Sequence, residues 1–469
     1  GASGVTLHYQ NTWGQTVNFN VSDGAATERS GTASADTPYD PDMSWTTAGF
    51  RFVDASNAAI GAQTAGVTSE TYYLQPVQSS CATAGAPCAG ICADLTKSGP
   101  FANGTTTNID LAYACTDPAT CSCSSAPATC VSNSLPTLTV TNNASNYYVQ
   151  GNSGSVSGYI QVPLKFATAP AGICSGATPC AAAPFTFNFT DVGEITLNAR
   201  YNVAPGGGGT GTSVGNPLPM TGVSAPFVVK PYDFAIIPCT SATPCLTPPA
   251  DPGLAGGGDV FIKSGNPFNA TITARAFGGT TTPNFGLGTA KGTETVTLTR
   301  TLMAPGAGSS GTLTGTGVTT PLYRSSFSYC VASVSDLAWD EVGVITLTAT
   351  NSTFLGQTLL TAGTSGNVGR FIPDHFDTVV VQSCAAGGFS YAGQPFTVQV
   401  TAKNAGGNKT LNYNAAAGFS KAVTLSAWDG TGLIANPGPG NLTPTQPPAI
   451  IAASAFTALD PAVALVSTP

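Results

Sequence analysis

Residues 341–349, Glu-Val-Gly-Val-Ile-Thr-Leu-Thr-Ala, have a near copy at residues 191–199, Asp-Val-Gly-Glu-Ile-Thr-Leu-Asn-Ala. After the glycine of each copy, apolar and polar residues alternate, which is the pattern of a half-buried antiparallel β-strand. Each copy is followed by a segment of proline and aromatic residues, at residues 229–234 and at residues 369–376. A chain that repeats both a strand and the linker after it is predicted to consist of tandem modules.

A third repeated element indicates where the modules begin. Gly265-Asn-Pro-Phe268 recurs as Gly393-Gln-Pro-Phe396, in the same order relative to the other repeats. The offsets between copies differ, as expected for one domain whose loops vary in length. The sequence therefore predicts four segments: a cysteine-rich β domain over residues 1–134, a β-sandwich module over residues 135–228, a β-sandwich repeat over residues 229–370 and a partial repeat over residues 371–469.

The last of these segments contains no further copy of the Val-Gly-x-Ile strand. A sandwich without this strand exposes an apolar face and an unpaired strand edge. Three outcomes are open: the native chain continues beyond residue 469, residues 450–466 fill the gap, or a neighbouring molecule donates a strand.

The composition favours many short strands with apolar cores. Only 8% of the 469 residues are charged, against about 25% in ordinary domains, while 42% are hydrophobic. The 55 glycines and 35 prolines are dispersed, as turns between short strands require. Residues 293–300 and 396–402 also alternate with period two, which places Val296 and Leu298 on one face. We expect an all-β chain of tandem Ig-like or β-sandwich domains, arranged as an elongated rod and stabilised by disulfides.

Charge and hydropathy exclude two classes of partner. The net charge is −8 and the sequence has no basic patch, which argues against nucleic acid and against anionic membrane surfaces. No run reaches the ~18 apolar residues of a membrane span. We expect no membrane span in this segment.

The cysteines predict an oxidising compartment, and hence an exported, extracellular or cell-surface protein. There are 13 cysteines and only 2 histidines. Cys174–Cys180 and Cys239–Cys245 share one spacing, and each pair is predicted to close a short loop as a disulfide. Seven more form a cluster: Cys81, Cys88, Cys92, Cys115, Cys121, Cys123 and Cys130. Zinc is the alternative for this cluster, but irregular spacing and the lack of a nearby histidine favour disulfides. Since 13 is odd, one thiol is free or pairs outside the segment.

The remaining reactive residues do not assemble into a recognisable catalytic pattern. His375 follows Asp374, but in a proline-marked linker, and the chain has no Gly-x-Ser-x-Gly motif. We therefore expect a packing or linker role for this pair, no enzymatic activity, no catalytic residues and no organic cofactor. Calcium is the only cofactor with candidate ligands, at Asp36, Asp40 and Asp42, although the EF-hand pattern is absent. Trp13 and Trp45 near this turn are candidates for stacking on a sugar.

Several segments resemble the MshQ-like proteins, which are encoded with the mannose-sensitive haemagglutinin type IV pilus and are often called agglutinin biogenesis proteins. The matching residues are 48–52, 72–77, 114–121, 191–197, 282–286, 366–376 and 389–396. The resemblance implies a large secreted or surface protein of Gram-negative bacteria, linked to type IV pili. It implies no enzymatic activity and transfers no catalytic residues.

Repeats, low charge and cysteines together predict a structural surface protein whose partners are pilus proteins, other surface proteins or copies of itself. Two alternatives stay open. One is a self-polymerising extracellular fibre subunit that exchanges strands. The other is a carbohydrate-binding adhesin that uses the loops near residues 36–45.

Overall fold

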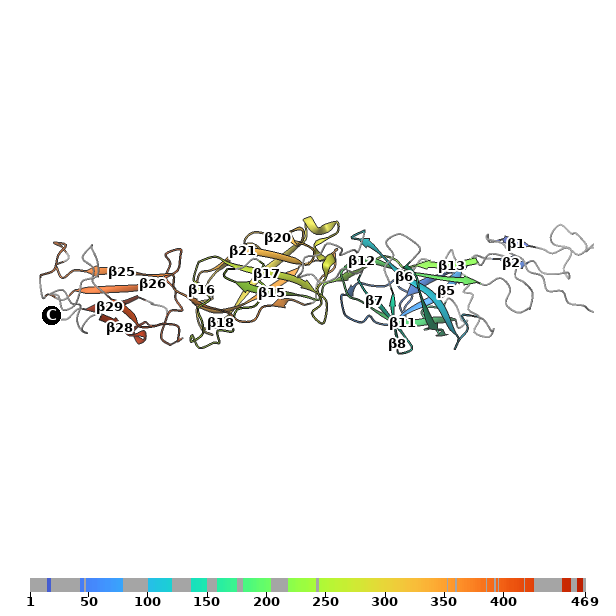
Figure 1. Cartoon of the computed structure of the whole chain (residues 1–469), viewed down its shortest axis with the longest axis horizontal. Helices are drawn as coiled ribbons and strands as arrows, with labels where there is room; N and C mark the ends of the chain where they lie inside the picture. The colour runs from blue at the N-terminus through green and yellow to red at the C-terminus, as the bar shows by residue number, and fades with distance from the viewer. Residues whose placement is uncertain are drawn as a thin grey trace, which may run out of the picture. The chain divides into compact units, whose positions relative to one another are not determined.

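The structure is a computed structural model of the chain (Figure 1). It describes residues 15–17, 43–45, 48–78, 100–119, 136–149, 158–174, 180–203, 218–241, 244–351, 353–358, 361–384, 386–391, 394, 396–416, 418–425, 449–456 and 462–466. These residues form strands and short 3-10 turns, and they contain no α-helix. Within the same residues, no helix is long and apolar enough to cross a membrane. The predicted all-β fold is confirmed, with the strands arranged in several sheets.

The chain divides into two compact units, the first made mainly of residues 1–125 and 132–230 and the second mainly of residues 231–275 and 281–469. The first unit contains a short antiparallel pair, β1 (Gln15–Val17) with β2 (Met43–Trp45). Its body, here called the first module, is a network of 12 hydrogen-bonded strands. They are β3 (Ala48–Val53), β4 (Gln63–Thr64), β5 (Tyr72–Gln78), β6 (Thr106–Asp117), β7 (Leu138–Asn142), β8 (Ser145–Val149), β9 (Ile160–Lys165), β10 (Ala167–Thr168), β11 (Ala181–Phe189), β12 (Gly193–Val203), β13 (Leu218–Val223) and β14 (Phe227–Lys230).

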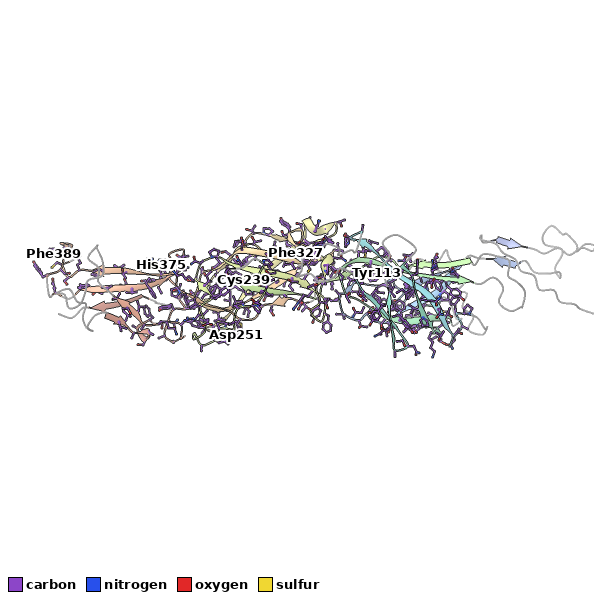
Figure 2. The ribbon with its side chains drawn as sticks, viewed as in Figure 1. Tyr113, Cys239, Asp251, Phe327, His375 and Phe389 are labelled. Atoms are coloured by element: carbon purple, nitrogen blue, oxygen red, sulfur yellow. A yellow bond between two sulfur atoms is a disulfide. The ribbon has the colours of Figure 1, made fainter. Side chains whose placement is uncertain are left out.

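The predicted division at residues 134 and 135 does not appear in this body. Strand β6 pairs with β12 over residues 110–117 and 194–200, and β5 pairs with β11. Strands from both predicted segments therefore share the same sheets and the same aromatic core. In this core Tyr113, which is labelled in Figure 2, lies edge-to-face on Phe189. Alternation along a strand identifies its buried face but not its partner, so the sequence pattern does not reveal that the two segments share a sheet.

The second module is a sandwich of two sheets in the second unit. One sheet has the order β15-β17-β21-β19 and the other the order β16-β24-β22-β18-β20, with β23 paired to β22. The strands are β15 (Asp233–Cys239), β16 (Ile262–Lys263), β17 (Phe268–Arg275), β18 (Thr295–Ala304), β19 (Leu313–Thr314), β20 (Leu322–Tyr323), β21 (Val331–Trp339), β22 (Gly343–Asn351), β23 (Gly363–Thr364) and β24 (Val368–Ile372). Three 3-10 turns connect them, η3 (Pro283–Gly286), η4 (Ala290–Gly292) and η5 (Arg324–Ser326).

The core of this module follows from the alternation in its sequence. Val296 and Leu298 of β18 are both 1% exposed, on the face predicted for them. Trp339 is fully buried at the end of β21, and its indole Nε1 donates to the carbonyl oxygen of Ser310 at 3.0 Å. The buried Phe327, which is labelled in Figure 2, packs edge-to-face on Phe285. An indole whose N–H is paired is a stable occupant of an apolar interior.

The third module begins after Pro373, and its described residues form fewer strands than those of the second module. A sheet of order β25-β26-β29 lies with a two-stranded sheet, β27-β28. The elements are β25 (His375–Val381), β26 (Thr397–Lys403), β27 (Val423–Leu425), β28 (Ala449–Ile451), η6 (Ala453–Ala455) and β29 (Ala462–Val466). The predicted boundaries at 228/229 and 370/371 fall inside β14 and β24, so each module begins a few residues later than the repeats indicated.

The tail of the chain takes a place in the third module, although not that of the missing strand. Strand β29 lies antiparallel to β26, as β21 lies antiparallel to β17 in the second module. The tail therefore supplies the counterpart of β21. Among the described residues of the third module, no strand takes the place of β22.

The repeated strand starts at a glycine for a reason of geometry. Gly193 and Gly343 have φ values of 137° and 140°, and the pairing register shifts at this point in both strands. A Cβ on Gly343 would collide with the carbonyl oxygen of Ala304, and one on Gly193 would lie 2.6 Å from the carbonyl oxygen of Asp117. A side chain at either position is therefore both strained and crowded.

We expect Gly343→Ala to lower the free energy of unfolding of the second unit by about 2–4 kcal/mol, since strain and collision add. Differential scanning calorimetry measures the effect. Gly366→Ala is the matched control, because nothing lies within 4 Å of its Cβ position. Equal melting curves for both variants would contradict this account.

Candidate functional site

The segment between β24 and β25 joins the second and third modules inside the second unit. Proline at position 373 has no N–H and ends the pairing of β24, and the N–H of Asp374 then donates to the carbonyl oxygen of Lys403 at 2.8 Å. Residues from both modules meet here. We call this set the junction: Glu341 and Val342 from the second module, and Asp374, Asn404, Leu411 and Asn412 from the third.

Glu341 is the buried acid of the junction, with 3% of its surface exposed. Its Oε1 accepts the N–H of Val342 at 2.8 Å and the N–H of Asn412 at 3.1 Å, while Oε2 accepts the N–H of Leu411 at 2.9 Å. Burial is the dominant influence and raises the pKa of this carboxyl above 4.5, against the opposing effect of the three N–H bonds. The carboxylate thus links the start of β22 to the backbone of the next module.

Asn412 completes the link from the other side. Its amide is 1% exposed, and its Nδ2 donates to the carbonyl oxygens of Ser309 at 2.8 Å and Val342 at 2.9 Å. Its Oδ1 accepts the N–H of Ser309 at 2.7 Å. Asn404 Nδ2 adds a bond to the carbonyl oxygen of Asp340 at 2.9 Å. Both N–H donors of the Asn412 amide and its carbonyl oxygen are used, all toward the second module.

A shared apolar core lies beside these polar contacts. Ala304, Val342 and Val344 of the second module belong to one buried cluster with residues of the third: Val400, Ala402, Tyr413, Phe419, Ile451 and Phe456. Continuous burial of this kind resists bending between modules, because opening the junction would expose apolar surface to water. The second and third modules are therefore packed together at their ends.

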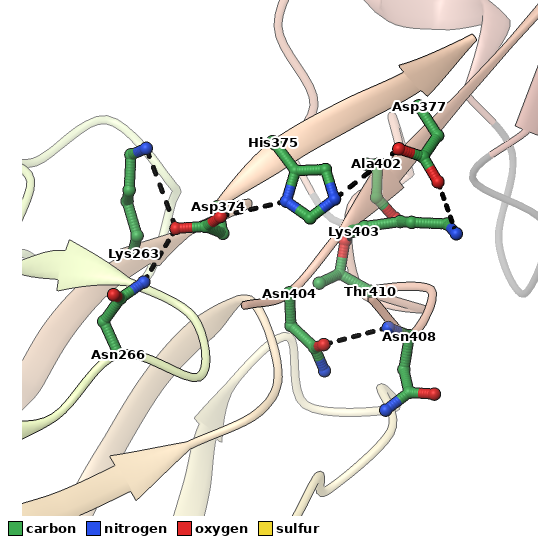
Figure 3. A network of polar contacts seen from close by, with 10 residues as sticks. All are labelled: Lys263, Asn266, Asp374, His375, Asp377, Ala402, Lys403, Asn404, Asn408 and Thr410. Atoms are coloured by element: carbon green, nitrogen blue, oxygen red, sulfur yellow. Dashed lines mark hydrogen bonds and ion pairs between the residues drawn. The ribbon is translucent and has the colours of Figure 1, made fainter. Parts of the chain in front are cut away.

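Asp374 and His375 lie at the exposed edge of the junction (Figure 3). Asp374 Oδ1 accepts from Asn266 Nδ2 at 2.7 Å and lies 3.7 Å from Lys263 Nζ, and Asp374 Oδ2 lies 2.9 Å from His375 Nδ1. The hydrogen bond with His375, followed by that with Asn266, lowers the pKa of Asp374. These contacts tie β25 to the end of β16.

The other ring nitrogen of His375 faces a second acid. Its Nε2 lies 3.6 Å from Asp377 Oδ1, while Asp377 Oδ2 lies 2.5 Å from Lys403 Nζ. The hydrogen bond from Lys403 lowers the pKa of Asp377. The ring nitrogens of His375 thus face two carboxylates, and neither is a hydroxyl or thiol nucleophile. The arrangement fits the linker role predicted for this pair.

The cysteine and metal candidates are only partly within the described residues. Cys174–Cys180 and Cys239–Cys245 are disulfides, each with a Cα–Cα distance of 5.7 Å. Cys115 of the predicted cluster is also disulfide-bonded, as is Cys330. Outside the described residues lie Cys81, Cys88, Cys92, Cys121, Cys123, Cys130, Asp36, Asp40 and Asp42. In the part of the chain that is described, Cys384 has a free thiol and no three His, Cys, Asp or Glu side chains are placed to hold a metal ion.

The first module contains a polar groove that no sequence motif indicates. It has a volume of about 470 Å³ and lies over β6, β9 and β12, with Asn108, Asp110, Gln161, Arg200 and Tyr201 in its lining. Arg200 Nη2 lies 2.9 Å from Asp110 Oδ2, and its guanidinium lies 4.5 Å from the centre of the Tyr159 ring. Asn108 and Asp110 lie on β6, Gln161 lies on β9, and Arg200 and Tyr201 lie on β12. No motif links these segments, so only the pairing of the three strands brings the residues together.

Tandem β-sheet modules, of which the second and third share a packed junction, define a modular all-β protein. Residues 31–215 match the first Ig-like domain of DUF6701, a domain of unknown function, and residues 230–333 and 341–458 match its second and third domains. The chain belongs to this three-domain family. The third match begins at Glu341, so the family model joins the strand β22 to the module that Glu341 contacts.

No curated protein sequence matches the chain. Among solved structures, it is similar to Escherichia coli alpha-2-macroglobulin in two forms. The form activated by porcine elastase shows 9% identity and a TM-score of 0.17, over 90% of this chain and 30% of that one. The native form shows 9% identity and a TM-score of 0.16, over 92% of this chain and 22% of that one. The chain spans less than a third of the length of either protein.

Glu341 predicts a specific pH dependence. Because its folded-state pKa is raised, the stability it contributes is full below pH 4.5 and is lost as the pH rises through the folded pKa. Glu341→Gln is expected to remove this decline. It should also cost about 1–3 kcal/mol at pH 7, because an amide NH₂ then faces a main-chain N–H donor. Thermal unfolding between pH 3 and 8 measures both effects.

Asp377→Asn serves as the control of opposite sign. The pKa of Asp377 is lowered, so its contribution is present above pH 3.8 and is lost as the pH falls. An Asp377→Asn variant should therefore be less stable than the parent above pH 3.8 and should converge with it as the pH falls. If Glu341→Gln shows the parent's pH profile, Glu341 does not titrate in the folded junction.

Proposed function

We propose that this chain is a structural segment of an exported surface protein, in which tandem Ig-like modules hold a fixed spacing along a filament or between a cell and its contact. The observation that carries the proposal is the junction. Glu341 and Asn412 are both at least 97% buried, and their side chains form hydrogen bonds that join the second module to the third. Such a joint is useful where a protein must transmit position or force, since it removes bending freedom.

Export is supported by the cysteines. Four described cysteines form two local disulfides, and Cys115 and Cys330 are also oxidised. Stable disulfides of this kind persist outside the cytosol. We accordingly propose an extracellular or cell-surface location.

The resemblance to MshQ-like proteins supports a more specific proposal. According to this proposal, the chain is part of a surface protein of a Gram-negative bacterium, and that protein acts with type IV pili or related filaments in cell adhesion. Its partners would be pilus or surface proteins, including copies of itself. We propose no enzymatic reaction and no cofactor, because the His375 pair serves the contact between modules.

An antibody against the chain should label filaments or the outer surface of intact cells that produce it. Immunogold electron microscopy gives the result directly, with permeabilised cells as the comparison. Label that appears only after permeabilisation would overturn the surface location. Surface label that is absent from filaments would overturn the pilus association alone.

Asn412→Ala tests the mechanical role of the junction. It leaves the carbonyl oxygens of Ser309 and Val342 and one buried N–H without their partner, so we expect a loss of about 2–4 kcal/mol at the junction. Single-molecule pulling on the whole chain should show the third module separating from the second at clearly lower force.

The matched control for that experiment is Asn408→Ala, an exposed asparagine four residues away on the same loop. Its pulling trace should equal that of the parent. Equal traces for Asn412→Ala and the parent would show that the amide does not hold the modules together.

Carbohydrate binding is a second candidate, favoured by the groove over β6, β9 and β12. Amide, carboxylate, guanidinium and tyrosine groups in one shallow groove are the donors and acceptors that sugar hydroxyls require.

A glycan array with and without calcium tests carbohydrate binding by this groove. We expect the double variant Asn108→Ala, Gln161→Ala to lose at least about tenfold in affinity, and exposed Ser145→Ala in β8 to lose none. An array without retained glycans would remove this candidate.

A further inference from the structure

Strand β25 exposes the side that should face the core of the third module. Phe376, Thr378 and Val380 stand opposite Ala402, Val400 and Val398 of β26 in the antiparallel register. Val400 and Ala402 are fully buried, so this is the core side of the sheet. Yet Phe376 is 39% exposed, Val380 is 54% exposed, and Thr378 is exposed as well.

The second module shows how the same side is normally covered. Its first strand, β15, places Phe234, Ile236 and Pro238 opposite residues of β17 in the equivalent register. Phe234 is fully buried, Ile236 is 5% exposed and Pro238 is buried. The two strands thus have the same position in homologous sheets and opposite burial.

The cover over β15 comes from the repeated strand and the strand paired to it. Gly363 of β23 packs so closely on the backbone of Phe234 that a Cβ there would collide with it. Strand β23 is held by β22 through the pairs Thr348 with Thr364 and Ala349 with Gly363. Burial of β15 therefore depends on β22 being in place.

A free strand edge in the third module lies where β22 would pair. In the second module, β18 pairs with β20 on one edge and with β22 on the other. The counterpart of β18 is β27, which pairs with β28, and within the described residues β27 has no second strand partner. The third module thus offers both an open apolar face and an open backbone edge to one further strand.

We propose that the third module is an acceptor for one polypeptide strand of the β22 type, with the pattern acid-Val-Gly-x-Ile-x-Leu-x-Ala. The strand pairs with β27 and lays its alternate apolar side chains over Phe376, Thr378 and Val380. It comes from outside residues 1–469, because both copies of the pattern in this chain, β12 and β22, are paired within their own modules. The proposal names a partner for the structural role given above, but its test does not depend on pili.

The probe is a synthetic peptide with the sequence of residues 341–351, added to the whole chain. Isothermal titration calorimetry should show one site per chain, with a negative heat-capacity change from apolar burial. Hydrogen–deuterium exchange should slow in residues 423–425. A peptide with both Ile345→Asp and Leu347→Asp should bind at least about tenfold more weakly, since it cannot bury its apolar side.

Two chain variants separate the two faces of β25. Val380→Asp lies on the open core side and should weaken binding of the parent peptide by about tenfold or more. Val379→Asp is the matched control, because Val379 is equally exposed at 53% on the opposite face and should leave binding unchanged. Since both residues are half exposed, neither variant should prevent folding.

Three results would overturn the proposal. The first is an absence of heat and of exchange protection with the parent peptide. The second is equal loss of binding in Val380→Asp and Val379→Asp. The third is a concentration-dependent dimer of the chain that the peptide does not disperse, because this would assign the open face to a second copy pairing edge to edge.

Discussion

Glu341 lies buried at the start of β22 with its carboxylate turned toward main-chain N–H groups of the following module, and the second unit is organised around that contact. A buried carboxylate is costly unless its oxygens are hydrogen-bonded, so the acid requires Leu411 and Asn412 to be where they are. The side-chain amide of Asn412 in turn donates to the carbonyl oxygens of Ser309 and Val342. Loss of alignment between the modules would remove the bonds from Leu411 and Asn412 to the carboxylate and the bonds of the Asn412 amide to Ser309 and Val342. The polar contacts therefore set the register of the two modules beside the shared apolar cluster.

The repeat of this arrangement is visible in the homologous strand. Asp191 stands before Gly193 as Glu341 stands before Gly343, is 2% exposed, and accepts the N–H of its neighbour Val192 at 2.8 Å. The turn that follows β17 in the second module is repeated after β26 in the third. The N–H of Thr282 donates to the carbonyl oxygen of Ala274, and the N–H of Thr410 donates to the carbonyl oxygen of Ala402, both at 3.1 Å. Similar short segments thus build the same local geometry in different modules, which explains why these stretches persist while the loops between them differ in length.

Much of the fold could be predicted from the sequence because individual strands, short disulfide loops and module repeats each depend on residues that are close together in the chain. Period-two alternation located β18, β22 and β26, the spacing of Cys174 with Cys180 and of Cys239 with Cys245 indicated closed loops, and the repeats indicated modules. The long-range pairing of β6 with β12 could not be predicted, since alternation determines faces and not partners. The junction could not be predicted for the same reason. Glu341 and Asn412 occur in separate repeats, and no sequence pattern in either segment indicates that they are in contact. The groove around Arg200 is likewise a product of sheet assembly alone.

The contacts of Glu341 with the third module are made to backbone and not to side chains. Any residue other than proline at positions 411 and 412 offers the same N–H group, so the carboxylate places little demand on the identity of its neighbour. A contact that needs only main-chain N–H groups can be duplicated together with its module. The duplicated acid then finds the same N–H groups in the module that follows it. Gene duplication can therefore lengthen such an array without first evolving a new pair of matching surfaces.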